Sequence, residues 1–159
     1  MVEVQVSGLA LAPNSSPVVL LKEVDGDKVL PIWIGAPEAR AIALALEGIE
    51  IERPLTHDLM KSIIEGLKVK VNRVVIHDLR ENTFYAKVCL LKDGSIVEVD
   101  ARPSDCIALA LRVRAPIYVN PEIMDLNSTP LKMDKEARAE ALRRYLKNLD
   151  PEDFGKYKL

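Results

Sequence analysis

The chain has 159 residues, of which 48% are hydrophobic, and this is enough for one domain with a substantial core. A formal net charge of −2 excludes nucleic-acid binding through an overall positive field, so any such binding must use a local patch. No run of about 18 apolar residues occurs, and the alternating first six residues are typical of a strand rather than of a signal peptide. We therefore expect a cytoplasmic protein with no membrane span.

The first third of the chain predicts three strands and a buried helix. Residues 2–11 alternate as in a strand, and residues 18–24 and 29–34 flank a tight turn, as in a hairpin. A helix is predicted from Pro37 to Glu47, because proline is tolerated in a first helical turn. The interior of this helix is almost wholly apolar and rich in alanine, so we expect it to be buried on most sides.

A second helix and a meander follow. The helix is predicted from Pro54 to Leu67, because six apolar residues form one stripe at helical spacing: Leu55, Leu59, Met60, Ile63, Ile64 and Leu67. Three consecutive antiparallel strands are then predicted over residues 69–77, 83–91 and 96–101.

The helix predicted from Pro103 to Arg114 repeats the pattern of the first. Both helices follow a strand, begin with proline and an acidic residue, and contain Ile-Ala-Leu-Ala-Leu. A shared packing requirement accounts for the five apolar residues, since alanine and leucine are common helix formers. The alternative is a duplication that turns both helix N-termini towards one site, and the shared proline and acid support it. A short strand over residues 117–119 and a helical turn capped by Asn120 complete the domain.

These elements predict an α+β fold with a mainly antiparallel sheet and two buried helices rich in alanine and leucine. We place the domain over residues 1–131 and a helical C-terminal tail over residues 132–159. The tail has a narrow apolar stripe, which could dock on its own domain, bind a partner subunit or frame a groove. Cys89 and Cys106 lie in apolar segments and are predicted to be buried free thiols, with a disulfide as the alternative.

Histidine and carboxylate groups supply the candidate chemistry. His57, at the start of the second helix, could transfer protons with Asp58 or Glu38 orienting it, or it could simply be an exposed or capping residue. Glu98 and Asp100 share one face of a strand, and Asp105 follows in the first turn of the next helix.

Three carboxylates brought so close could hold Mg²⁺ or Mn²⁺, and Arg102 between them could clamp a phosphate. The alternative is that Asp105 serves the helix N-terminus while Arg102 neutralises its acidic neighbours.

Three motifs resemble the bifunctional nuclease domain family, in the same order along residues 2–131. They are Pro31-Ile32-Trp33-Ile34-Gly35 with Glu38-Ala39, Arg53-Pro54-Leu55-Thr56-His57-Asp58-Leu59, and Asp100-Ala101-Arg102-Pro103-Ser104-Asp105 with Ile107-Ala108-Leu109-Ala110. The resemblance implies an α+β domain, a homodimer and, as in plant relatives, a nuclease acting on RNA and DNA. It supplies no settled catalytic set, so the candidate site residues are chosen by chemistry within these motifs.

The first functional hypothesis is a nuclease that hydrolyses phosphodiester bonds in RNA, DNA or both with the help of Mg²⁺ or Mn²⁺. The residues and roles assigned are catalysis by Glu38, His57 and Asp58, substrate binding by Arg53 and Arg102, and metal binding by Asp100 and Asp105. The alternative is a non-catalytic regulatory domain that binds a small anionic ligand or a protein partner. The two hypotheses differ in whether a deep cleft collects these side chains, and we predict that the starts of the second and third helices converge.

Overall fold

A computed structural model describes residues 1–130 of the chain, and over this range it shows four helices and one sheet of eight strands. The strands are β1 (Val2–Leu11), β2 (Pro17–Glu23), β3 (Lys28–Trp33), β4 (Lys70–Arg80), β5 (Thr83–Lys92), β6 (Ser95–Ala101), β7 (Ile117–Val119) and β8 (Thr129–Pro130). The helices are α1 (Ala36–Leu46), α2 (Thr56–Gly66), α3 (Pro103–Val113) and α4 (Pro121–Asn127). The predicted α+β class is confirmed, whereas the predicted helical tail over residues 132–159 lies outside the described residues. None of the helices within residues 1–130 is long and apolar enough to cross a membrane.

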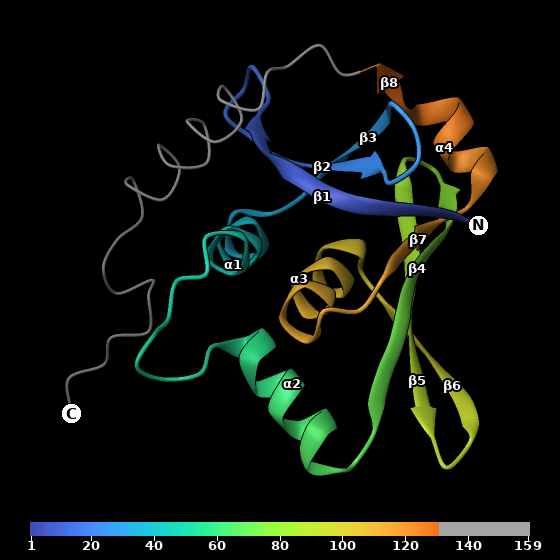
Figure 1. The fold of residues 1–159 in the computed structure, drawn as a ribbon. Helices are drawn as coiled ribbons and strands as arrows, with labels where there is room; N and C mark the ends of the chain where they lie inside the picture. The colour runs from blue at the N-terminus through green and yellow to red at the C-terminus, as the bar shows by residue number, and fades with distance from the viewer. Residues whose placement is uncertain (131–159) are drawn as a thin grey trace.

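The sheet has the same order of strands on either side of its centre. Its order is β6-β5-β4-β7-β1-β2-β3-β8, so two antiparallel meanders, β1–β2–β3 and β4–β5–β6, flank β7. Each meander leads directly into a helix, α1 or α3 (Figure 1). The strand β7 pairs antiparallel with β1 and parallel with β4, which gives the one parallel pair in the described sheet. This repeated topology supports the duplication alternative raised by the sequence.

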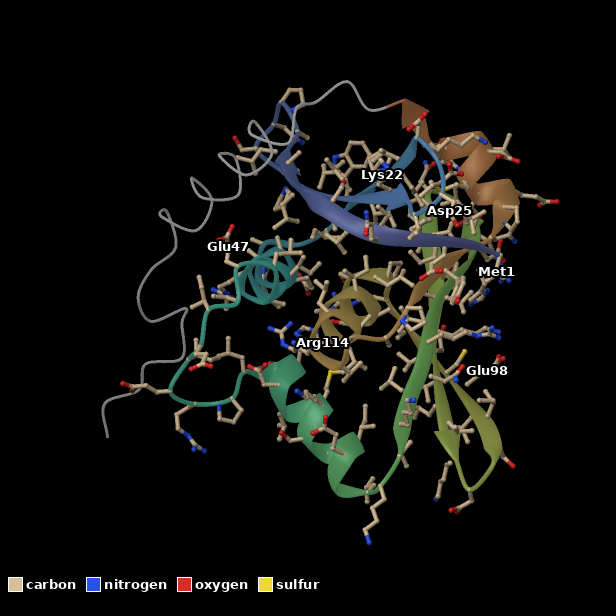
Figure 2. The ribbon with its side chains drawn as sticks, in the orientation of Figure 1. Met1, Lys22, Asp25, Glu47, Glu98 and Arg114 are labelled. Atoms are coloured by element: carbon tan, nitrogen blue, oxygen red, sulfur yellow. The ribbon has the colours of Figure 1, made fainter. Side chains whose placement is uncertain are left out.

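The strand β6 forms one edge of the sheet. Six of its seven residues, from Ser95 to Asp100, are exposed. Glu98 of this strand, labelled in Figure 2, forms an ion pair with Lys87 of the neighbouring strand β5 at 2.7 Å. Charged side chains on an edge strand oppose pairing with further strands.

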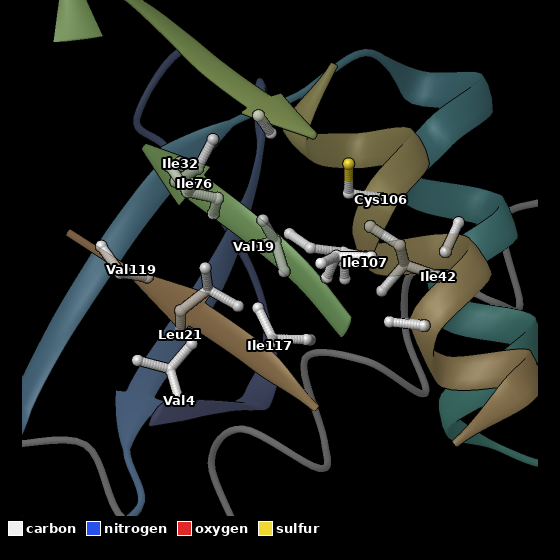
Figure 3. Packing of buried hydrophobic residues seen from close by; sticks show 14 of the residues in the cluster. Val4, Val19, Leu21, Ile32, Ile42, Ile76, Cys106, Ile107, Ile117 and Val119 are labelled. Atoms are coloured by element: carbon white, nitrogen blue, oxygen red, sulfur yellow. The ribbon is translucent and has the colours of Figure 1, made fainter. Parts of the chain in front are cut away.

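The helices α1 and α3 pack side by side against the sheet, as predicted. Ala43 of α1 and Ala108 of α3 are fully buried, and small residues let two helices approach closely. Figure 3 shows Ile107 of α3 pointing towards the strands that carry Val19 and Ile76. Both cysteines are free and buried, which confirms that prediction.

The packing of α2 differs from the prediction. Leu59, Ile63 and Leu67 are 51%, 53% and 70% exposed, so the predicted apolar stripe is not buried as a whole. Met60 and Ile64 do pack against the core, on the same line of the helix as His57, which is only 7% exposed. Residues at this spacing share one helix face, and it is this narrow face that meets the core. The line through Leu59, Ile63 and Leu67 lies beside it, exposed to solvent.

Candidate functional site

Side-chain bonds through Arg102 and Asp105 link the starts of three helices. Glu38 lies in the first turn of α1, His57 in the first turn of α2 and Asp105 in the first turn of α3, which Arg102 precedes as its N-cap. Arg102 Nη2 lies 2.8 Å from Glu38 Oε1, and Arg102 Nε donates to Asp105 Oδ2 at 2.9 Å. His57 Nε2 lies 2.9 Å from Asp105 Oδ1. We call Glu38, Arg102, Asp105 and His57 the helix-start network.

The predicted convergence of the second and third helix starts is confirmed for His57, Arg102 and Asp105. The sequence analysis assigned Asp58 or Glu38 as the carboxylate that orients His57. This assignment was wrong, because the carboxylate bonded to His57 is that of Asp105. Since a carboxylate only accepts hydrogen bonds, Nε2 of His57 carries a proton.

Exposure within the helix-start network rises from His57 to Arg102. The side chains are 9% exposed in His57, 15% in Glu38, 25% in Asp105 and 64% in Arg102. The guanidinium of Arg102 is therefore the group that a ligand in solution meets first. The histidine lies behind the carboxylate of Asp105.

Hydrogen bonds keep the arginine and the aspartate charged. Bonds to Asp105 and then to Glu38 raise the pKa of Arg102, against a smaller effect of burial. Partial burial favours the neutral form of Asp105, but hydrogen bonds from Arg102 and His57 together outweigh it and lower the pKa of this carboxyl. The first turns of helices also favour acidic groups through their dipoles.

Asp58 is held away from the network by a second arginine. Its Oδ2 accepts from the backbone N–H of Leu55 at 2.9 Å, and its Oδ1 accepts from Arg112 Nε at 2.8 Å. Arg112, whose side chain is 8% exposed, also donates to the carbonyls of Ala108 and Ala41. It thereby joins α1, α2 and α3, and Asp58 has a structural partner that the sequence analysis missed. The signal was present, because Arg112 is a charged residue that directly follows the apolar run from Ile107 to Leu111 in the predicted helix.

Comparison with known proteins decides the family. The bifunctional nuclease domain profile matches residues 19–132 of the chain. The chain belongs to this family. It is 44% identical over 164 residues to an uncharacterized protein of Mycobacterium tuberculosis, covering 97% of this chain and 98% of that protein.

Plant relatives are named bifunctional nucleases. The chain is 32% identical over 116 residues to bifunctional nuclease 1 of Oryza sativa subsp. japonica, and 30% identical over 108 residues to bifunctional nuclease 1 of Arabidopsis thaliana. These alignments cover 69% and 65% of this chain but only 35% and 33% of the two plant proteins. The chain therefore spans about a third of the plant nucleases that it matches.

Besides Asp58, two further predicted site residues of this bifunctional nuclease domain lie outside the network. Arg53 is exposed in the segment before α2, and Asp100 is exposed on β6, opposite Lys87 in register. None of the bonds that join the helix-start network involves either residue. Glu98 is also separate, because its carboxylate pairs with Lys87.

The described residues contain no ready-made cluster of metal ligands. Residues 1–130 hold no group of three or more His, Cys, Asp or Glu side chains placed to bind a metal ion. Both oxygens of Asp105 already accept hydrogen bonds, Oδ1 from His57 and Oδ2 from Arg102. Binding of Mg²⁺ or Mn²⁺ between Asp100 and Asp105 stays a prediction.

A cavity of about 550 Å³ lies beside Arg112, between the end of α1, the start of α2 and α3. Asp58 and Arg112 line it, together with the segment that contains Ile49 and Ile51. None of the four network residues is part of its lining. The four network side chains thus gather by direct contact at the surface rather than around this cavity.

Proposed function

We propose that the protein is a nuclease that hydrolyses phosphodiester bonds in RNA, DNA or both, and that the helix-start network is its active site. The observation that carries the proposal is the network through Arg102 and Asp105 that links three helix N-termini in a member of the bifunctional nuclease domain family. The names of the plant relatives support the same activity.

Arg102 is the phosphate-binding group in this proposal. A guanidinium presents a planar fork of N–H donors that matches two phosphate oxygens, and its charge persists at all ordinary pH values. Glu38 and Asp105 hold the fork in place, while 64% of the side chain remains exposed. The positive dipole ends of three helices add to the attraction for an anion.

The carboxylate of Glu38 is assigned the proton transfer. Hydrolysis joins a water oxygen to phosphorus, breaks the bond to the leaving oxygen and moves one proton from the water to that oxygen. Glu38 is assigned as the group that receives this proton and returns it. His57 is buried behind Asp105, so its assigned role is to position that carboxylate and, through it, Arg102.

The test is an assay of purified protein on labelled single-stranded RNA and DNA. Arg102→Met should lower kcat/KM by about 10²-fold or more, as removal of one donor to transition-state charge does in other enzymes. Arg114→Met is the matched control, because Arg114 is exposed at the opposite end of α3. Equal activity of wild type and Arg102→Met would place the activity elsewhere or in a contaminant.

The same assay with a chelator tests separately whether activity requires a metal ion. Activity that survives EDTA would show that the network works without a divalent ion. Loss of activity with EDTA and recovery with Mg²⁺ or Mn²⁺ would show that substrate oxygens complete a site that the described carboxylates lack.

One observation favours the alternative of a regulatory anion-binding domain. The charge of Arg102 is already paired with two carboxylates, as in a network that shapes a binding surface rather than a reaction centre. This alternative predicts no hydrolysis by wild type, together with anion binding that Arg102→Met abolishes.

We also propose a homodimer located in the cytoplasm. Leu59, Ile63 and Leu67 form an exposed apolar line on α2, and such a surface is typical of an interface that can pair with itself about a two-fold axis. Two buried free thiols suit a reducing compartment. Sedimentation should show a dimer at micromolar concentration that Ile63→Lys dissociates, and a wild-type monomer would contradict the proposal.

A further inference from the structure

The one tryptophan of the chain, Trp33, is 61% exposed at the end of β3. An indole ring gains free energy from burial, so one that remains exposed on a sheet is available to a ligand. The proposed hydrolysis mechanism assigns no role to this ring.

A cavity of about 400 Å³ adjoins Trp33. Its lining consists of apolar and aromatic groups with two carboxamides: Pro31, Trp33, Leu79, Phe84, Asn82 and Asn127. This volume lies within the range of roughly 300–1,000 Å³ typical of small-ligand sites. Aromatic faces suit a flat ring, and carboxamides both donate and accept hydrogen bonds, as the edge of a nucleobase requires.

The chain limits how far this cavity can lie from the helix-start network. Trp33 precedes Glu38 by five residues, a separation of at most about 17 Å even for extended chain. Phe84 belongs to β5 of the other meander, two residues before Ala86. Because Ala86 pairs with Ala101, the last residue of β6, Phe84 lies at the end of the sheet where β6 leads into Arg102. The two aromatic residues thus flank the two segments that enter α1 and α3.

We propose that this cavity binds an unpaired nucleobase stacked on Trp33, while Arg102 holds a phosphate of the same strand. The substrate is then single-stranded nucleic acid, because a base inside a duplex is not free to stack on a side chain. The inference rests on the proposed nuclease function for the role of Arg102, but base binding is measurable without cleavage. A cavity of this size with amides at its wall suits one ring system better than the face of a protein helix.

Intrinsic fluorescence gives the first test, since Trp33 is the chain's one tryptophan. A single-stranded deoxyadenosine dodecamer should quench the emission of wild-type protein, and an abasic dodecamer with the same phosphates should not. Equal quenching by both would overturn the proposal, because the phosphates alone would then account for binding.

Anisotropy of a labelled dodecamer gives the second test. Trp33→Ala should weaken binding about 5- to 150-fold, the range that stacking of one base supplies, and Trp33→Phe should restore most of it. Ile96→Ala is the matched control, because Ile96 is 48% exposed near the start of β6 and does not line this cavity. The slope of affinity against salt should stay the same in Trp33→Ala, since no phosphate contact is lost.

The remaining outcomes separate this inference from the proposed function. Base-dependent binding by a protein that cleaves nothing would support the cavity and reject the nuclease. Cleavage unaffected by Trp33→Ala, with unchanged affinity, would reject the cavity and leave the nuclease in place. A shift in the sedimentation of the free protein on Trp33→Ala would assign the ring to a protein interface and would also overturn the inference.

Discussion

The two arginines at the ends of α3 should respond in opposite ways to the same substitution. Arg112 is buried and bonded to three helices, whereas Arg102 is mostly exposed. Replacement of Arg112 by Met keeps most of the apolar volume but removes a donor from the carboxylate of Asp58 and from the carbonyl of Ala41.

The magnitude follows from what is left unpaired. Removing one partner of a buried ion pair costs about 3–5 kcal/mol, and an unsatisfied buried acceptor costs about 1–3 kcal/mol. The side chain of Asp58 is 32% exposed, so water can replace part of the lost bond. We expect Arg112→Met to lower the free energy of unfolding by about 2–4 kcal/mol, and the Tm by roughly 4–16 °C. Arg102→Met removes a partner that is itself 64% exposed, but it leaves Glu38 and Asp105, which are 15% and 25% exposed, without that partner, so it should cost less, about 1–2 kcal/mol.

Urea unfolding followed by circular dichroism measures both variants, and the nuclease assay is run on the same samples. The expected pattern is a larger stability loss in Arg112→Met and an activity loss in Arg102→Met without unfolding. A cost below about 1 kcal/mol for Arg112→Met would refute the assignment of Arg112 as the link between the three helices. Equal stability losses in the two variants would refute the distinction that exposure makes between them.

Three further results are expected. Ala43→Leu and Ala108→Leu should each overpack the core and cost about 1–3 kcal/mol in thermal unfolding, whereas unchanged stability would mean that the helices have room between them. The pKa of Asp105 lies below its unfolded value of 3.8, so its bonds stabilise the protein above pH 3.8, and this contribution is lost as the pH falls through the lower folded pKa. Carbon NMR should place the titration of Asp105 below 3.8, and Arg102→Met should move it upwards; a midpoint at or above 3.8 in wild type would contradict the network. Burial, with the nearby charge of Asp105 adding to it, raises the pKa of the Cys106 thiol to about 12, so a thiol reagent at pH 8 should react only after unfolding. If the reagent reacts rapidly with both native wild type and native Cys106→Ala, the reactive thiol is Cys89. If it reacts rapidly with native wild type but not with Cys106→Ala, the thiol of Cys106 is accessible, which would contradict the prediction.

Local patterns in the sequence were enough for the elements of secondary structure. The helix predicted from Pro103 to Arg114 is observed from Pro103 to Val113, and the hairpin and meander strands lie within a few residues of their predicted bounds. Proline at a helix start, the tight turns and the two kinds of apolar periodicity act over a few residues, so they can be recognised without knowing the rest of the fold. The repeated proline and acid also placed Glu38 and Asp105 in first helical turns.

Contacts between distant residues required the tertiary structure. His57 and Asp105 are 48 positions apart, and no local pattern selects Asp105 over the adjacent Asp58 as the partner of the histidine. On a helix, neighbouring residues point in different directions, so Asp58 reaches Arg112 near the end of α3 while His57 reaches Asp105 at its start. The exposure of Leu59 has the same origin: periodicity shows that α2 is amphipathic, but the element packed against it decides which line of that face is buried.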